Sequence, residues 1–312
     1  MNDKIKFWNG RRYNSLDFYL KYTFGEKLYK LSLNGGMSCP NRDGKISFGG
    51  CIFCSEGGSG EFAANPSFDI DKQIDSAKAL ISNKFSGNKF IAYFQAYTNT
   101  YAPVDYLESL FMPVVLRDDI AVLSIATRPD CLEKEKLGLI ERLSRIKPVW
   151  VELGLQTKHQ KTAELINRGY NTECYDEAVK NLKSVGADVI THMIIGLPYE
   201  TREQILETAD HIAKSGADGI KLQLLHVLEG TRIAEMYRNG DFDVLTEEAY
   251  ISLVADIISI LPEHIVIHRL TGDGDKSLLI SPRWSGDKRH ILNSINHKLK
   301  IRNVYQGSFL LK

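Results

Sequence analysis

Three of the chain's five cysteines lie in one glycine-bearing segment, CPNRDGKISFGGCIFC. Eleven residues separate Cys39 from Cys51, and two residues separate Cys51 from Cys54. Thiolates are soft ligands that suit zinc and iron–sulfur clusters. A structural zinc site normally has four protein ligands, whereas a four-iron cluster held by three thiolates leaves one iron open to a small molecule. We therefore expect an iron–sulfur cluster here, and a non-catalytic cluster or zinc protein is the alternative.

The other two cysteines are predicted to be packing residues. Cys174 shares a helical stripe with Ala178 and Leu182, and free cysteine is often buried. Cys131 follows the tetrapeptide TRPD, just past an apolar run, and a single cysteine there is more often a packing residue than a ligand. Both are therefore expected to be dispensable for a metal centre.

The cysteine segment follows the first of six strand-like runs, several of them almost continuously apolar, as expected of parallel strands buried on both faces. Helical patterns alternate with these runs, which predicts a parallel α/β sheet, either an incomplete barrel or a doubly wound sheet. In either fold the cysteines would lie at the carboxyl edge of the sheet, where active sites gather. The six runs are KLYKLSLN (27–34), KFIAYFQAY (89–97), IAVLSIATR (120–128), VWVELGLQ (149–156), DVITHMIIGL (188–197) and GIKLQLLHV (219–227).

Local signals mark several helix ends. Gly186 suits a helix terminus, and Thr201 with Gln204 has capping-box spacing. After Val227 the pattern changes to helices at about 231–238 and 246–260, followed by a short strand in HIVIHRL. We divide the chain into an N-terminal extension (1–27), a barrel (28–227) and a C-terminal extension (228–312).

The composition and the amino-terminal sequence indicate where in the cell the protein is expected. The chain has 312 residues, 43% of them hydrophobic, and no apolar run reaches the roughly 18 residues of a membrane span. The amino terminus lacks the apolar core of a secretion signal, so we expect a cytoplasmic protein with reduced thiols and no membrane partner.

The net charge of zero hides an asymmetry. Residues 281–312 carry seven Lys and Arg against one acid, whereas residues 31–280 carry 25 basic and 35 acidic residues. Basic ends on an acidic body suggest a docking surface for a polyanion. The alternative is a solvated terminus without a partner.

The cysteine segment resembles that of radical S-adenosyl-L-methionine (SAM) enzymes. Their commonest spacing is tighter between the first two cysteines, and a subgroup with a longer first gap has a signature close to CPNRDGKISFGGCIFCSEGGSG. The chain as a whole resembles the YtqA/YhcC-type family of this superfamily, which is related to enzymes that modify the tRNA wobble uridine. The resemblance extends through TRPD (127–130), ELGLQT (152–157), NRGY (167–170), MIIGLPYET (193–201) and GDGDKSLLISPRWS (272–285).

This resemblance implies a fold and two cofactors. The fold is a partial (β/α)6 TIM barrel of the radical SAM type with a C-terminal extension. The cofactors are a [4Fe-4S] cluster, held by Cys39, Cys51 and Cys54, and S-adenosyl-L-methionine, whose amino and carboxylate groups bind the open iron. A reductant such as flavodoxin or ferredoxin would supply the electron that cleaves SAM to a 5′-deoxyadenosyl radical.

The resemblance also suggests SAM contacts outside the cysteines. The glycine-rich motif usual at the end of strand two is absent, and polar residues occupy that place. An alternative role for Glu152 is an ion pair in the barrel lumen. An alternative role for Arg168 is pairing at the end of a helix. His192 and Lys221 also point toward a lumen and are left as candidates. The predicted SAM-binding residues are Phe53, Gln95, Tyr97, Asn99, Glu152, Gln156 and Arg168.

The family's implied reaction is removal of the carboxymethyl group from carboxymethylaminomethyl-uridine at the tRNA wobble position, which leaves aminomethyl-uridine. The partner would be tRNA, seated in part by residues 228–312. Tyr97, Tyr101 and Trp284 are candidates for stacking on an extruded base. The alternative is a radical SAM enzyme acting on a porphyrin or another small molecule.

Overall fold

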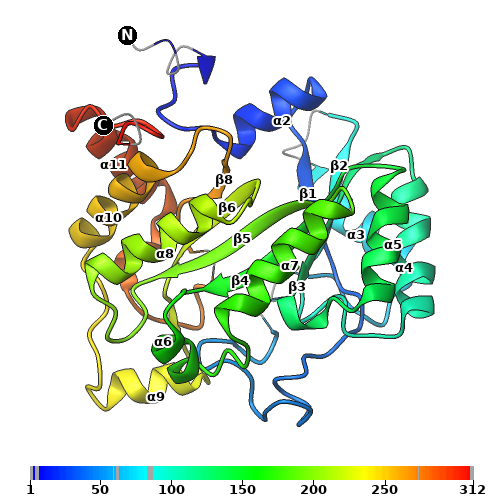
Figure 1. Cartoon of the computed structure of the whole chain (residues 1–312), viewed down its shortest axis with the longest axis horizontal. Coiled ribbons are helices and arrows are strands. Elements are labelled where there is room, and N and C mark those ends of the chain that lie inside the picture. The colour runs from blue at the N-terminus through cyan, green and yellow to red at the C-terminus, as the bar shows by residue number, and fades with distance from the viewer. Residues whose placement is uncertain are drawn as a thin grey trace.

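The computed structural model describes residues 3, 7–58, 60, 63–82, 87–272 and 274–309. Seven parallel strands form one sheet in the order β1-β2-β3-β4-β5-β6-β8, and most of the helices pack along its outer face (Figure 1). The strands are β1 Tyr29–Leu33, β2 Phe90–Phe94, β3 Ile120–Thr127, β4 Val149–Gln156, β5 Asp188–Ile195, β6 Gly219–Leu224, β7 Val227–Leu228, β8 Val266–Arg269 and β9 Leu279–Ser281. The helices are α2 Leu16–Phe24, α3 Ile70–Ile81, α4 Val104–Leu116, η2 Pro129–Cys131, α5 Lys134–Ser144, α6 Gln160–Leu165, α7 Thr172–Ser184, α8 Arg202–Lys214, α9 Arg232–Arg238, α10 Glu247–Ile260, η3 Arg283–Gly286 and α11 Lys288–Ile301.

The six predicted strands are confirmed, and the sheet is the partial barrel rather than the doubly wound alternative. The strand predicted in HIVIHRL is also present as β8, but it belongs to the main sheet, where it pairs in parallel with β6. The N-terminal segment covers the other edge of β8, because the Ile267 N–H donates to the Asn14 carbonyl at 2.8 Å. The C-terminal part of the chain thus supplies a seventh strand.

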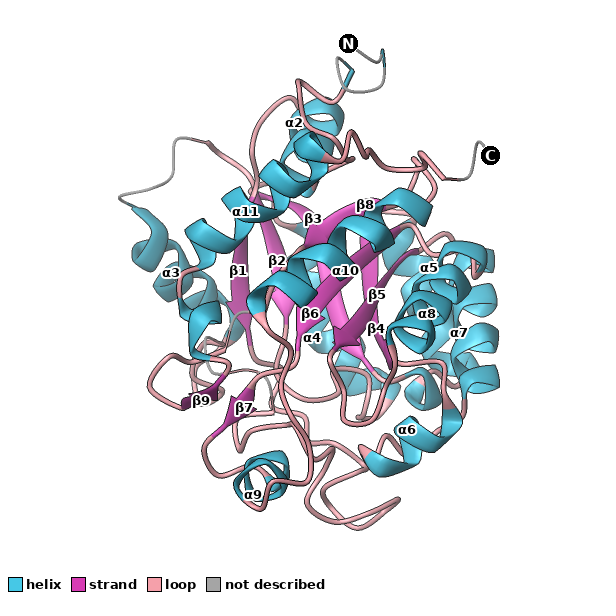
Figure 2. Cartoon of the chain, turned by 90° about the vertical axis from the view of Figure 1, so that its left-hand side faces the viewer, coloured by secondary structure: helices cyan, strands magenta, loops and turns pink. Residues whose placement is uncertain are grey.

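Alternation along the strands divides the inside of the barrel into layers. The first layer is apolar and packs under α2, which lies at the amino end of the sheet (Figure 2). Its members on the strands are Ile91, Val122, Trp150 and Ile190. Residues i and i+2 of a strand point to the same face, so the residues two positions further along also face the lumen. In this second layer they are polar. The polar layer contains Tyr93, Ser124, Glu152, His192 and Lys221.

The helix signals in the sequence are confirmed with one exception. Thr201 and Gln204 form the capping box of α8, and Gly186 follows α7 with φ +79°. The prediction that Cys174 is core is wrong: it lies in the first turn of α7 and is only partly buried, because the buried stripe runs through Tyr175 and Ala178. Cys131 is buried, as predicted.

Residues after β6 cover the carboxyl end and one side of the barrel. The β7–β9 ribbon and α9 lie at the carboxyl end of the sheet, opposite α2 (Figure 2). The Ile233 N–H at the start of α9 donates to the Ile52 carbonyl of the cysteine segment at 3.0 Å. Helices α10 and α11 pack on each other, and α11 was not predicted. Among the described helices, none has both the length and the apolar character needed to cross a bilayer.

Candidate active site

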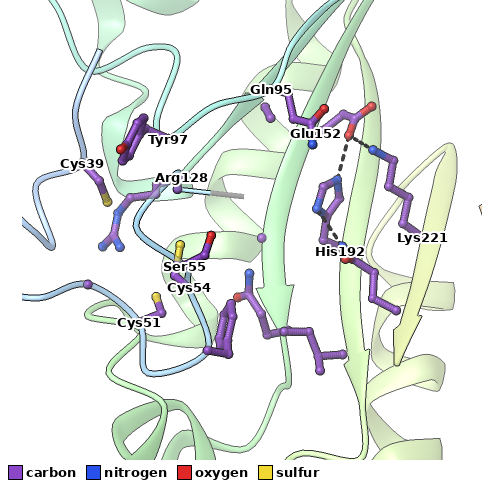
Figure 3. Close-up of a pocket in the computed structure, with 18 of the residues that line it drawn as sticks. Cys39, Cys51, Cys54, Ser55, Gln95, Tyr97, Arg128, Glu152, His192 and Lys221 are labelled. Atoms are coloured by element: carbon purple, nitrogen blue, oxygen red, sulfur yellow. Dashed lines mark hydrogen bonds and ion pairs between the residues drawn. The ribbon is translucent and has the colours of Figure 1, made fainter. Parts of the chain in front are cut away.

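The three clustered cysteines line one cavity of about 240 Å³ at the carboxyl end of the strands. Figure 3 shows Cys39, Cys51 and Cys54 on one side of this cavity and Glu152, His192 and Lys221 on the other. We call these sides the cysteine end, formed by Cys39, Cys51 and Cys54, and the ion end, formed by Lys30, Tyr93, Glu152, His192, Lys221 and Arg269.

Tight backbone turns and two polar side chains shape the cysteine end. Gly49 and Gly50 both have φ +81°, a conformation that glycine adopts without strain. The Arg42 guanidinium donates to the Cys54 carbonyl at 3.1 Å and also to the Ser55 carbonyl. Asn41 Nδ2 lies 2.5 Å from the Asn167 carbonyl and 3.6 Å from the Cys51 Sγ. These contacts hold the loop to its own later residues and to the segment between α6 and α7.

The donor set at the cysteine end fits a sulfur-ligated cluster. Three thiols face the cavity, the Asn41 amide reaches the Cys51 sulfur, and the Arg128 guanidinium lines the same wall. Among the described residues, no three His, Cys, Asp or Glu side chains lie close enough together for a single metal ion. Burial raises the pKa of Cys51 to about 12, so without metal its thiol stays protonated at neutral pH. A metal would displace that proton on binding.

Tyr97 anchors the far end of the cysteine segment. Its N–H donates to the Gly58 carbonyl at 3.0 Å, and its hydroxyl donates to the Glu56 carbonyl at 2.7 Å. A Cβ on Gly58 would lie 2.3 Å from the Tyr97 ring, so only glycine allows this approach. Tyr97 therefore couples the segment to the end of β2.

The ion end is built around the fully buried Glu152 on β4. Its Oε1 accepts from Lys30 Nζ at 3.0 Å and Ser124 Oγ at 2.9 Å. Its Oε2 accepts from His192 Nε2 at 2.7 Å and from Lys221 Nζ. Both carboxylate oxygens are thus occupied by donors from four different strands.

The ionisation of this group follows from burial and close charges. Burial alone would raise the pKa of Glu152, but the ammonium groups of Lys221 and Lys30 hold it well below its usual value. Burial lowers the pKa of Lys221, and the Glu152 carboxylate opposes that shift. Burial and the Lys221 charge lower the pKa of His192 to about 4. Near neutral pH, Glu152 is therefore ionised and His192 is neutral.

The structure brings most, but not all, of the predicted SAM-binding residues to the cavity. Asn99 is fully buried, and its Nδ2 donates to the carbonyls of Phe94, Ala96 and Ala126 at 2.9–3.1 Å. Asn99 and Arg168 are not among the lining residues, and their SAM contacts stay predictions. The predicted residues that line the cavity are Phe53, Gln95, Tyr97, Glu152 and Gln156.

Arg168 braces the backbone after β4. The residue is 1% exposed, and its guanidinium donates to the carbonyls of Leu155 at 2.8 Å, Thr157 at 2.5 Å and Tyr170 at 2.9 Å. Asn99 and Arg168 both hold backbone segments that lead into the cavity.

Sequence reasoning missed several residues of the cavity. Arg128 belongs to the TRPD motif, where its guanidinium makes a bidentate contact with Asp130 at 2.9 and 2.7 Å and donates to the Arg168 carbonyl at 3.0 Å. The usable signal was a polar residue at alternate positions inside an apolar strand. By that criterion the residues to find were Tyr93, Gln223 and Arg269 on the cavity wall, together with Lys30 and Ser124, which hydrogen-bond to Glu152.

Comparison with known proteins agrees with this geometry. The model of the Radical SAM superfamily matches residues 39–212, and the model of the Radical_SAM C-terminal domain matches residues 217–301. The YtqA protein of Bacillus subtilis is 44% identical over 299 residues, which cover 96% of this chain and 93% of that protein. The YhcC protein of Escherichia coli is 35% identical over 288 residues, which cover 92% of each chain.

More distant similarities involve proteins with larger chains. The tRNA uridine(34) acetyltransferase of Methanocaldococcus jannaschii is 29% identical over 180 residues, which cover 56% of this chain and 32% of that protein. The solved structure of Methanocaldococcus infernus Elp3 with an N-terminal deletion superposes with a TM-score of 0.67 at 18% identity, covering 89% of this chain and 64% of that one. The second similarity shows a shared fold.

The family match fixes the cofactors. The matched region begins at Cys39 and ends at residue 212. It includes the whole cysteine segment and the elements from α3 to most of α8. Radical SAM domains carry a [4Fe-4S] cluster and SAM, and the three thiols facing this cavity fit the cluster. The chain belongs to the radical SAM superfamily, and its nearly full-length similarity to YtqA and YhcC places it with those proteins.

Proposed function

We propose that the chain modifies tRNA at the wobble uridine by breaking the bond between the side-chain nitrogen and the carboxymethyl group of carboxymethylaminomethyl-uridine. SAM would be the oxidant for a two-electron oxidation at the carboxymethyl carbon, and hydrolysis would then leave aminomethyl-uridine and release the two carbons as glyoxylate. One observation carries the choice of tRNA: 56% of the chain is similar in sequence to a tRNA uridine(34) acetyltransferase. The basic segment at 281–312 supports the same partner.

The cofactors, when bound, supply a 5′-deoxyadenosyl radical, and the protein supplies position and shielding. Cys39, Cys51 and Cys54 would hold the cluster. The Asn41 amide and the Arg128 guanidinium stabilise negative charge on the sulfur atoms through a hydrogen bond and through proximity. The cavity extends from the cysteine end to the ion end, so a substrate group held between them is shielded from bulk water.

The basic segment divides into two parts. Arg283, Lys288 and Arg289 are exposed at η3 and the start of α11, directly after the β7–β9 ribbon. Leu228 of that ribbon lines the cavity. We propose that these cations bind phosphates of tRNA beside the cavity mouth.

Two cations later in the segment make ion pairs within the protein. Lys298 lies 3.8 Å from Glu248, and Arg302 lies 2.5 Å from Asp256, both on α10. These pairs hold α11 against α10. We therefore assign the tRNA contact to the first part of the segment.

The three aromatic residues considered for base stacking have different surroundings. Trp284 packs on Tyr250, and its indole N–H donates to the Leu245 carbonyl at 3.3 Å. Tyr101 is half-buried, with Lys45 Nζ 5.2 Å from its ring centre. Tyr97 lines the cavity. Stacking is therefore better assigned to Tyr97 or Tyr101 than to Trp284.

The test is anaerobic reconstitution with SAM, reduced flavodoxin or ferredoxin, and bulk tRNA that contains carboxymethylaminomethyl-uridine. Nucleoside mass spectrometry should show that this nucleoside falls and that aminomethyl-uridine rises in proportion. Release of 5′-deoxyadenosine with unchanged nucleosides would contradict the proposal. Absence of tRNA binding at low salt would favour a small-molecule substrate.

A further inference from the structure

Three of the described residues combine a positive φ with a side chain other than that of glycine or asparagine. They are Tyr97 at +59°, Gln156 at +60° and Tyr199 at +65°. All three lie at the carboxyl ends of strands, after β2, at the end of β4 and after β5. Bulky residues are strained in this conformation, and such strain gathers at functional sites. Tyr97 and Gln156 line the cavity, so Tyr199 is the one of the three that still lacks an explanation.

Tyr199 occupies a place in a tight turn that suits glycine. The Glu200 N–H donates to the Leu197 carbonyl at 3.3 Å, which closes a turn of four residues. Pro198 is the second residue of this turn, and Tyr199 is the third. Proline in second place and a positive φ in third place are typical of a type II turn, whose third residue is commonly Gly or Asn. The turn is held at its end, since Glu200 Oε1 accepts from Thr157 Oγ1.

The Tyr199 ring faces solvent, since the residue is 67% exposed. The preceding residues of the turn, Leu197 and Pro198, are buried instead. An exposed ring gains little free energy from burial, and a positive φ costs free energy in a residue that has a Cβ. Folding therefore gains nothing from a tyrosine at this position, which points to a partner outside the chain.

The turn lies between the cysteine segment and the basic segment. Leu197 belongs to the same apolar cluster as Ile52, which is part of the cysteine segment. On the other side, a Cβ on Gly196 would lie 3.0 Å from the Leu245 side chain. The Leu245 carbonyl in turn accepts from the indole of Trp284, at 3.3 Å, beside the exposed cations of η3 and α11. A tRNA bound by those cations, with its wobble base in the cavity, would therefore pass close to this turn.

We infer that Tyr199 stacks on a base of the anticodon loop next to the wobble uridine. The inference rests on the proposed function, which places phosphates on one side of the turn and the wobble base on the other. Bases of single-stranded RNA loops stack on exposed aromatic side chains, and every base has a flat face that allows this contact. The turn already holds the ring outward, so binding does not have to order it. Tyr97 and Tyr101 remain the candidates for the extruded wobble base itself.

The test measures binding of an anticodon stem-loop with carboxymethylaminomethyl-uridine to reconstituted protein. Tyr199→Asn removes the ring and supplies a residue that tolerates a positive φ. It should bind roughly 5- to 150-fold more weakly than the parent, the range for loss of one stacked base. Tyr199→Phe keeps the ring and should bind like the parent. Equal binding by parent and Tyr199→Asn, or an equal loss in Tyr199→Phe, overturns the inference.

Denaturant titration of the same variants tests whether the ring serves the fold. Because the turn is strained for tyrosine, Tyr199→Asn should unfold at the same or a higher denaturant concentration than the parent. A lower midpoint would show that the ring stabilises the folded protein, and the inference would then be overturned.

Stem-loops that lack one base at a time identify the partner of the ring. Removal of the stacked base should weaken binding to the parent but have little further effect on Tyr199→Asn, because both changes delete the same contact. Additive losses at every loop position overturn the inference. The matched control is Tyr22→Ala, which removes a 71% exposed ring from α2, at the opposite end of the barrel (Figure 2). This control should bind like the parent, and a loss equal to that of Tyr199→Asn would also overturn the inference.

Nucleoside analysis of the same samples separates this inference from the proposed reaction. If binding depends on the ring but the parent produces no aminomethyl-uridine, the stacking contact stands and the reaction is wrong. If the parent converts the wobble nucleoside yet Tyr199→Asn binds equally well, the reaction stands and the stacking contact is wrong. If the parent does not bind the stem-loop at low salt, the inference is overturned together with the tRNA partner.

Discussion

The two ends of the cavity are built in different ways. The cysteine end is a loop whose three cysteines lie within sixteen residues of sequence, from Cys39 to Cys54. The ion end is assembled by strands, since Glu152 on β4 meets Lys30 on β1, His192 on β5 and Lys221 on β6. The first end presents three thiols that fit a cluster, whereas the second is an ion-pair network within the protein.

This difference explains what each end tolerates. Removing a cysteine takes away a ligand that no neighbouring residue replaces, and the fold has other supports. Removing Glu152 leaves the buried ammonium of Lys221 and the partly buried ammonium of Lys30 without their shared counter-ion. We therefore expect variants at the cysteine end to lose cofactor, and variants at the ion end to lose stability.

The largest effect is expected at Cys51. Cys51→Ala, prepared anaerobically, should lose most of its iron, sulfide and visible absorption, whereas Cys174→Ala and Cys131→Ala should keep a single four-iron cluster. Iron and sulfide analysis with visible spectra checks this. Normal cluster content in Cys51→Ala, or stoichiometric zinc without iron in anaerobically purified protein, would break the distinction between the two ends.

The second effect is on folding. Glu152→Ala should reduce the free energy of unfolding by about 3–5 kcal/mol, because it leaves buried charge uncompensated. Denaturant titration measures it. The control is Glu141→Ala, which breaks an exposed pair with Arg145 and should cost less than about 1 kcal/mol. Equal losses in the two variants would show that the ion end does not depend on its buried carboxylate.

The third effect concerns pH. His192 has a pKa of about 4 in the folded protein, below its ordinary value, so only the unfolded chain takes up this proton as pH falls from 7 to 4. Stability should therefore fall through this window by roughly 2–3 kcal/mol on account of His192. His192→Gln should have a flatter slope of unfolding free energy against pH. The same slope in parent and variant would show that folding does not lower the pKa of His192.

The smallest effect lies outside both ends. Lys288→Glu/Arg289→Glu should weaken tRNA binding by about tenfold and reduce its dependence on salt, because fewer counterions are released. Cluster content should be unchanged. Lys180→Glu/Lys214→Glu makes the same change of charge on α7 and α8 and should bind tRNA like the parent. If the two double variants behave alike, the basic segment has no specific partner.

The contrast between the ends also explains which parts of the fold and of the site could be predicted from the sequence. The cysteine spacing predicted three ligands because the motif is local, and apolar runs predicted the strands. Lys30 was missed because its partner Glu152 is 122 residues away, and only the strand register brings them together. HIVIHRL was predicted as a strand, but a seven-residue run does not reveal that it pairs with β6. The carbonyl partners of Arg168 could not be predicted, because they depend on a turn that the sequence does not specify.

The proposed reaction is tested most directly by a synthetic anticodon stem-loop with one carboxymethylaminomethyl-uridine at the wobble position. Parent protein and Cys51→Ala are incubated anaerobically with SAM and reductant, and the nucleosides are quantified together with 5′-deoxyadenosine. We predict that the parent forms aminomethyl-uridine and 5′-deoxyadenosine, and that Cys51→Ala forms neither. An unchanged wobble nucleoside in a parent reaction that releases 5′-deoxyadenosine would contradict tRNA as the substrate.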